Sequence, residues 1–174
     1  MAAKRRLRYQ VATSLDGFIA GPQGEYDWIA EDPTLDLEAF AEQFDTLLMG
    51  RRTYELALSQ GSMLESMGKA VVVVSSTLDP SQHPDATILS TGVADAVARL
   101  KREPGKDIWL FGGGALFRTM LDAGLVDSVE LAVSPILLGD GVPVLPPGRR
   151  CPLGLVESKA LPSGMLILTY QVTE

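Results

Sequence analysis

Asparagine is absent from this sequence, and cysteine and histidine each occur once. The missing asparagine excludes N-linked glycosylation, and the single cysteine, Cys151, cannot form an internal disulfide. Without clustered thiols or imidazoles we expect no bound metal. Basic residues are also few, since 15 Lys and Arg against 22 Asp and Glu give a net charge of −7. This balance argues against partners such as nucleic acid or an anionic membrane.

Long apolar runs are lacking as well. The longest, residues 70–74, is far too short to span a bilayer, so we expect a soluble, cytoplasmic protein. The chain has 174 residues, of which 46% are hydrophobic. This length and composition predict one globular domain over residues 1–174.

Alternating strand-like and helix-like segments predict an α/β fold. The valine run 71–74 is typical of a strand buried on both faces of a parallel sheet. A helix capped by Thr34 or Asp36 is expected to carry Leu37, Phe40, Ala41 and Phe44 on its apolar face. The other expected strands are 7–13, 46–49, 86–89 and 107–111, and the other expected helices are 51–58, 93–102 and 115–123.

Beyond Gly124 the pattern changes to β structure. Strands are expected over 126–138, 153–161 and 165–172, with a turn at 162–164 between the last two. The sequence therefore predicts a C-terminal antiparallel hairpin.

Three predicted strands end in groups suited to an anion. Gly112, Gly113 and Gly114 follow one strand and precede a helix, where free backbone N–H groups favour phosphate. Gly50, Arg51, Arg52 and Thr53 follow another strand, and Ser75 and Ser76 follow the valine run. Each segment alone could be a plain turn or helix cap, but ligands in open α/β sheets bind at the carboxyl ends of strands.

Four segments, in order along almost the whole chain, resemble the dihydrofolate reductase superfamily. Thr46 to Glu55 is similar to its Met-Gly-Arg-x-Thr-(Tyr/Trp)-Glu segment, and Gly112 to Phe117 to its Gly-Gly-Gly segment. Ala12 to Ala20 resembles the Ser-(Leu/Val)-Asp-Gly opening of the riboflavin-biosynthesis branch, the RibD C-terminal reductase domains. Ser134 to Gly141 resembles the Pro-x-x-Leu-Gly-x-Gly segment of that branch.

This resemblance implies a three-layer fold with a mixed, mostly parallel sheet flanked by helices, and NADPH as the hydride donor. It implies that Gly50, Arg51, Arg52 and Thr53 hold cofactor phosphates, and that Ser75 and Ser76 lie near the 2′-phosphate. Gly112, Gly113, Gly114, Ala115 and Leu116 would cradle the pyrophosphate, while Ala12 and Ile19 would flank the nicotinamide.

The substrate side rests on fewer residues. Asp36, Asp16 and Glu38 are the acidic candidates for catalysis or substrate binding, and Asp36 to Phe40 resembles the helix start that carries the substrate-binding acid of dihydrofolate reductases. Asp36 could equally be a helix cap, and Asp16 a turn former. Trp28 and Phe40 are candidates to line the pocket, although such aromatic residues are more often core.

The sequence thus predicts an NADPH-dependent reductase of a pyrimidine- or pteridine-like heterocycle. Dihydrofolate reduction and an NADP-binding module without turnover are the alternatives. The resemblance also implies a homodimer through the C-terminal β region.

Overall fold

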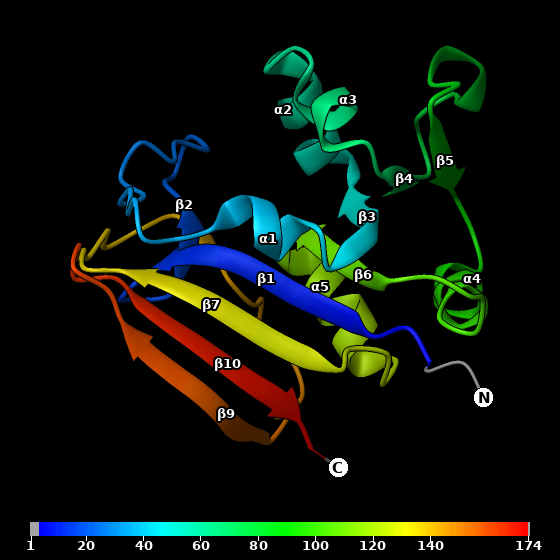
Figure 1. The fold of residues 1–174 in the computed structure, drawn as a ribbon. Coiled ribbons are helices and arrows are strands. Elements are labelled where there is room, and N and C mark those ends of the chain that lie inside the picture. The colour runs from blue at the N-terminus through cyan, green and yellow to red at the C-terminus, as the bar shows by residue number, and fades with distance from the viewer. Residues whose placement is uncertain (1–3, 174) are drawn as a thin grey trace.

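A computed structural model describes residues 4–173 and centres on an eight-stranded sheet of order β5-β4-β3-β6-β1-β7-β10-β9 (Figure 1). The first six strands in this order are parallel to one another, β10 is antiparallel to β7, and β9 is antiparallel to β10. The strands are β1 (Leu7–Ser14), β3 (Phe44–Gly50), β4 (Ala70–Val74), β5 (Ala86–Leu89), β6 (Asp107–Gly112), β7 (Ser128–Ser134), β9 (Leu153–Ala160) and β10 (Leu166–Val172). The predicted mixed sheet with a C-terminal hairpin is confirmed.

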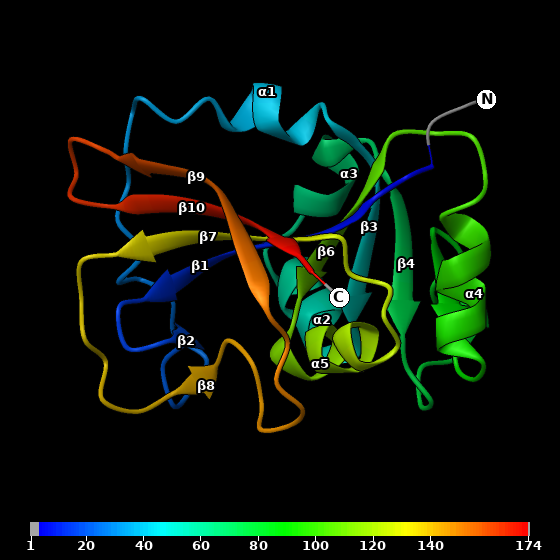
Figure 2. The same ribbon diagram turned by 90° about the horizontal axis from the view of Figure 1, so that it is seen from below.

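Helices cover both faces of the parallel half (Figure 2). They are α1 (Leu37–Ala41), α2 (Arg51–Ser59), α3 (Met63–Met67), α4 (Val93–Leu100) and α5 (Gly114–Asp122), with a 3-10 turn η1 (Pro80–Gln82). Within residues 4–173 no helix is long and apolar enough to cross a membrane.

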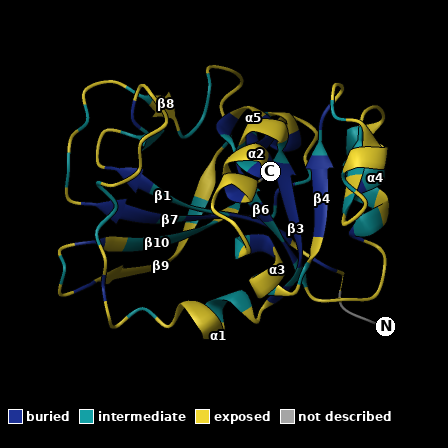
Figure 3. Cartoon of the chain, turned by 90° about the horizontal axis from the view of Figure 1, so that it is seen from above, coloured by how far each residue is buried: buried dark blue, intermediate teal, exposed yellow. Residues whose placement is uncertain are grey.

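The apolar segment of β3 contributes to two hydrophobic cores, because successive side chains of a strand point to opposite faces of the sheet. Leu48 faces a cluster that includes Val97 of α4 and Phe117 of α5. Its neighbours Leu47 and Met49 face α2 and α3 on the opposite side. All three side chains have no exposed surface, so β3 is buried on both faces, as parallel central strands require. Figure 3 shows the same contrast between buried central strands and the exposed α1.

The helix around residue 40 is shorter than the sequence predicts. It ends at Ala41, and Phe44, which we expected on its apolar face, is instead the first residue of β3. Phe44 is 1% exposed and packs against Phe40 and Trp109 at ring-centroid distances of 5.1 Å. The spacing of Phe40 and Phe44 fits a helix, but Phe44 makes its contacts with Phe40 and Trp109 from the first position of strand β3.

Other boundaries also differ from the prediction. The strand expected over 126–138 is confined to Ser128–Ser134, because Pro135 has no N–H to continue the ladder. The sequence reading missed α3 and the two-stranded ribbon formed by β2 (Phe18–Ala20) and β8 (Val142–Pro143). These elements are only two to five residues long, too short for periodicity to reveal.

Candidate functional site

Strand β3 delivers the start of α2 to the carboxyl edge of the sheet. Gly50 is the N-cap residue of α2, and no side chain caps this helix. The first turn carries no acidic residue, whereas Arg51 and Arg52 open the helix. The free N–H groups and both guanidinium groups therefore make this end of α2 positive.

The adjacent strand β6 delivers α5 in the same way. Gly113 is its N-cap, again without a side-chain cap, and the peptide bond between Gly112 and Gly113 is cis. Gly112 has φ +147°, which L side chains rarely adopt, and a Cβ there would lie 3.4 Å from Thr53 Oγ1. Because Met49 of β3 pairs with Gly112, the two turns lie side by side. The structure thus brings the predicted Gly50 and Gly112 segments together, with two uncapped helix N-termini suited to an anion.

Gly114 has a packing role. A Cβ on this residue would lie 2.7 Å from the backbone oxygen of Pro143 and 3.1 Å from that of Val144. The glycine therefore lets α5 approach the end of β8 and the residue that follows it. Leu116 is buried in the core beside α5, while Ala115 is exposed at the start of the helix.

A pocket of about 380 Å³ lies where β4 and β5 end. Hydroxyl groups and one guanidinium dominate its lining, which comprises Arg51, Val74, Ser75, Ser76, Thr77 and Ser90. Among residues 4–173, no acidic side chain lines it. The buried Ser75 shapes the turn, because its Oγ accepts the backbone N–H groups of Thr77 at 3.2 Å and Leu78 at 3.1 Å.

Thr77 and Ser90 were missed at the level of sequence. Ser90 directly follows the predicted strand 86–89, so the same rule that selected Ser75 could have found it. Arg51, which the rule did find, also forms an exposed i,i+4 ion pair with Glu55 at 3.2 Å. The neighbouring Arg52 is exposed and does not line the pocket.

Ala12 and Ile19 lie on β1 and β2, and both are half-buried. Ala12 pairs with Ala132 of β7 and contacts a small cluster that includes Leu161 and Met165. The residues predicted beside the nicotinamide are thus in the carboxyl-terminal part of β1 and in the ribbon that follows it.

The Asp16 carboxylate organises a loop. It accepts hydrogen bonds from Ser14 Oγ at 2.7 Å and from the backbone N–H groups of Gly139 at 2.7 Å and Leu138 at 3.1 Å. These bonds, that from Ser14 foremost, lower the pKa of Asp16 to about 2. A carboxylate with such a pKa stays ionised near neutral pH, which favours anchoring over proton donation.

The remaining substrate candidates lie on α1 and the loop before it. Asp36 caps α1 by accepting the backbone N–H of Ala39 at 2.9 Å, and both Asp36 and Glu38 are exposed. Phe40 packs edge-on against Trp109 with centroids 5.2 Å apart. The indole N–H of Trp28 is donated to the backbone oxygen of Glu25 at 3.0 Å. These four residues lie in one segment. Asp36 and Trp28 form hydrogen bonds with backbone groups three residues away, whereas Phe40 packs against Trp109 of the distant strand β6.

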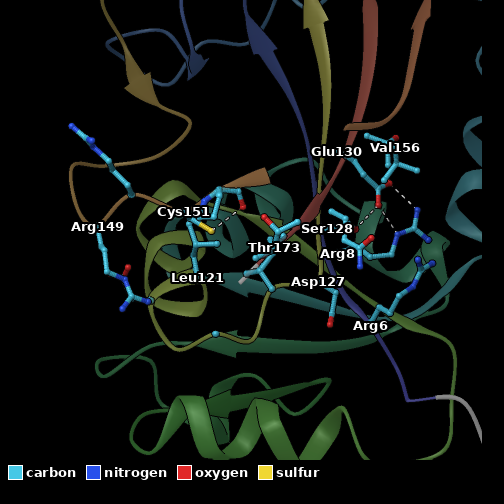
Figure 4. A pocket seen from close by; sticks show the side chains of 18 residues that line it. Arg6, Arg8, Leu121, Asp127, Ser128, Glu130, Arg149, Cys151, Val156 and Thr173 are labelled. Atoms are coloured by element: carbon cyan, nitrogen blue, oxygen red, sulfur yellow. Dashed lines mark hydrogen bonds and ion pairs between the residues drawn. The ribbon is translucent and has the colours of Figure 1, made fainter. Parts of the chain in front are cut away.

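A second cavity, of about 900 Å³, lies at the opposite edge of the sheet, near the beginnings of β1 and β7 (Figure 4). Its floor holds a buried ion pair in which Arg8 donates to both carboxylate oxygens of Glu130 at 2.7 Å. Cys151 also lines it, but none of the predicted site residues does. In residues 4–173 no three His, Cys, Asp or Glu side chains are grouped for metal binding.

This sheet order and these strand-end turns define a dihydrofolate reductase-like fold. Dihydrofolate reductase from Enterococcus faecalis, solved with NADP(H), shares it with a TM-score of 0.68 and 18% identity over the full length of both chains. The protein belongs to the RibD C-terminal domain family, whose model matches residues 5–167.

Two proteins with higher sequence identity to this chain support its membership of the family. YyaP of Bacillus subtilis (strain 168), described as uncharacterized, is 32% identical over 96% of this chain and 95% of its own length. A putative riboflavin biosynthesis protein from Shewanella sp. PV-4 has a solved structure with a TM-score of 0.84 and 27% identity, covering both chains completely.

Proposed function

We propose that this protein is an NADPH-dependent reductase that acts on a planar pyrimidine- or pteridine-like heterocycle. The observation that carries the proposal is the pocket formed by Arg51, Ser75, Ser76, Thr77 and Ser90 beside the uncapped N-terminus of α2. A guanidinium and several hydroxyl groups suit a phosphate monoester, such as the 2′-phosphate that distinguishes NADPH from NADH. The carboxylate paired with Arg51, that of Glu55, is itself exposed and is not part of the pocket lining.

The rest of the cofactor would follow the carboxyl edge of the sheet. The N-termini of α2 and α5 would hold the pyrophosphate, and Ala12 and Ile19 would flank the nicotinamide. NADPH supplies a hydride when bound. The protein's task is to orient the heterocycle beside it, and the segment with Trp28, Asp36, Glu38 and Phe40 is the proposed substrate side.

Titration of the purified protein with NADPH and NADH, followed by turnover assays, tests this proposal. The absorbance of the reduced nicotinamide would be followed after adding 5-amino-6-(5-phosphoribosylamino)uracil or dihydrofolate separately. We expect preferential NADPH binding and oxidation with the aminouracil. Oxidation with dihydrofolate alone would favour the alternative reductase activity. Tight binding with no oxidation across a panel of heterocycles would indicate a binding module, and no binding would refute the cofactor assignment.

We propose in addition that two copies of the chain pair through β9. This strand is one of the two edge strands of the sheet, and all of its residues except Gly154 are exposed. Leu155 and Val156 are 59% and 63% exposed. Large apolar side chains on an edge strand that remains in water are unfavourable, because such an edge can pair with another chain. In an antiparallel pairing centred on Ser158, Glu157 would face Lys159 of the second copy, so the edge is complementary in charge to itself.

Light scattering on the Val156→Lys variant tests this pairing. We expect a dimer for the unaltered protein and a monomer for the variant, because a lysine on the edge disfavours strand addition. Leu137→Lys is the matched control, since Leu137 is 69% exposed but lies in the segment after β7. It should remain a dimer. A monomeric unaltered protein at micromolar concentration would overturn the proposal.

A further inference from the structure

The segment between β2 and α1, residues 21–36, has no helix or strand of its own. It leads into α1, a five-residue helix with no buried residue. Phe40 packs against Phe44 and Trp109, which fixes the C-terminal end of this helix beside the sheet. The N-terminal end, with the exposed substrate candidates Asp36 and Glu38, buries no side chain, so its position depends on how the preceding segment is anchored.

The main anchor is Asp32, which is only 9% exposed. Its carboxylate accepts the backbone N–H and the hydroxyl of Thr34, which closes a local turn. It also accepts the backbone N–H of Ser163 at 3.0 Å, from a residue 131 positions away. Ser163 lies in the turn between β9 and β10, so one buried carboxylate joins the segment before α1 to the C-terminal hairpin.

Two further contacts surround this bond. The backbone N–H of Ala30 is donated to Ser134 Oγ at 3.3 Å, at the end of β7. Ala30 and Leu35 pack against a cluster that includes Leu161 and Met165. Residues 30–35 are thereby held on the β7–β10–β9 side of the sheet, whereas the proposed cofactor pocket lies at β4 and β5 on the other side.

The carboxylate is well suited to this task. Its hydrogen bonds, those from Thr34 first, hold the pKa of Asp32 well below its usual range. It is therefore ionised near neutral pH and acts only as an acceptor. An amide at this position could keep the bonds to Thr34, but its nitrogen cannot accept the Ser163 N–H.

We infer that Asp32 is a positioning residue for the heterocycle, which sets the place of α1 through its bond to the hairpin turn and does not affect cofactor binding. This inference rests on the proposed reductase function. Asp32 has no contact with reacting atoms and acts through the segment that it anchors. Loss of the bond should therefore raise KM for the heterocycle and leave the Kd for NADPH unchanged.

The Asp32→Asn variant tests this inference by two independent measurements. In hydrogen–deuterium exchange on the protein alone, we expect faster exchange in peptides covering 30–41 and 161–165. In the assay with 5-amino-6-(5-phosphoribosylamino)uracil, we expect KM to rise about 10- to 100-fold with a smaller change in kcat, as misplacement of binding groups produces. The Kd for NADPH should stay within about twofold. A tenfold change would require about 1.4 kcal/mol of lost binding energy, and Asp32 does not line the proposed cofactor pocket.

Asp79→Asn is the matched control. Asp79 forms the same local turn, accepting the N–H of Ser81 at 2.9 Å and its hydroxyl at 2.8 Å, but within residues 4–173 its carboxylate makes no bond to a distant segment. It should change neither KM nor the exchange of 161–165. Ser163→Pro, which removes the backbone donor from the other side, should reproduce Asp32→Asn. Ser163→Ala keeps this backbone N–H and loses only the hydroxyl that also stabilises the Asp32 carboxylate, so its effect should be clearly smaller.

The outcomes separate this inference from the proposed function. If the unaltered protein binds no NADPH, the proposed function fails, and the exchange measurement alone decides whether Asp32 holds α1. If NADPH binds but exchange in 30–41 is the same in Asp32→Asn, the inference is wrong. Equal weakening of NADPH and heterocycle binding would also overturn it, because that result indicates a general loss of structure.

Discussion

Replacement of Arg51 by alanine is expected to weaken NADPH binding by about 10- to 100-fold, the range that corresponds to a lost hydrogen bond to a charged group. NADH binding should change little, because NADH has no phosphate to place among Arg51, Ser75 and Ser90. The loss also leaves Glu55, now paired with Arg51 at 3.2 Å, without its counter-charge near the bound phosphate. Titration of both cofactors by nicotinamide fluorescence measures the effect.

A second variant tests the same pocket at Ser90, which follows β5. Ser90→Asp adds a negative charge to a lining that has none, so it should lower the preference for NADPH over NADH even with Arg51 intact. Arg102→Ala is the control, because Arg102 is an exposed arginine that lies after α4 and outside the pocket. Unchanged selectivity in both pocket variants would place the 2′-phosphate elsewhere.

Replacement of Glu130 by alanine is expected to lower the free energy of unfolding by about 3–5 kcal/mol, as removal of one partner from a buried ion pair does. The side chains of Arg8 and Glu130 are 8% and 9% exposed, and the pair is bidentate. Arg8 would keep Gln43 at 2.7 Å and the ring of Phe44 at 4.6 Å, neither of which neutralises its charge. It would also keep Asp107 at 3.3 Å, but that carboxylate is shared with Arg6 at 2.8 Å and so compensates the charge of Arg8 only in part. Urea unfolding monitored by circular dichroism measures the change.

Two comparisons give this result its meaning. Asp122→Ala removes one partner of the i,i+4 pair with Arg118, in which Asp122 is 48% exposed, and should cost about 0–1 kcal/mol. The double variant Arg8→Leu with Glu130→Leu should recover most of the stability lost in Glu130→Ala, because no uncompensated charge stays buried. If Glu130→Ala and Asp122→Ala cost the same, the burial argument is wrong.

Much of the candidate site could be predicted from the sequence, because ligands of open α/β sheets bind at the carboxyl ends of the strands. Gly50 and Gly112 each follow a run of apolar residues and precede a helix, so both turns had to lie at one edge if the strands are parallel. The valine run 71–74 likewise predicted a strand buried on both faces, and Val73 has no exposed surface. These features depend on residues close together in the sequence, so their patterns can be recognised without knowledge of the tertiary structure.

The features that the sequence could not predict depend on distant partners. Phe44 has helical spacing with Phe40, yet its contact with Trp109 in the folded protein places it in β3. Gly114 is predicted as part of a phosphate cradle, and this stays a prediction, but the sequence does not indicate that the backbone of Pro143 leaves no room for a Cβ there. Asp32 is not among the predicted site residues, because its partner Ser163 is 131 positions away in the sequence.

The sequence by itself therefore determined the class of fold, the strand-end turns and the positive groups that open α2. These properties follow from residue period, chain direction and charge, which are all written locally. Only the tertiary structure decided that β3 lies between β4 and β6, that Ser90 joins Arg51 in one pocket and that Asp32 anchors the segment before α1. Such contacts join residues far apart in the chain, and strand order and side-chain packing select them only when the whole sheet has formed.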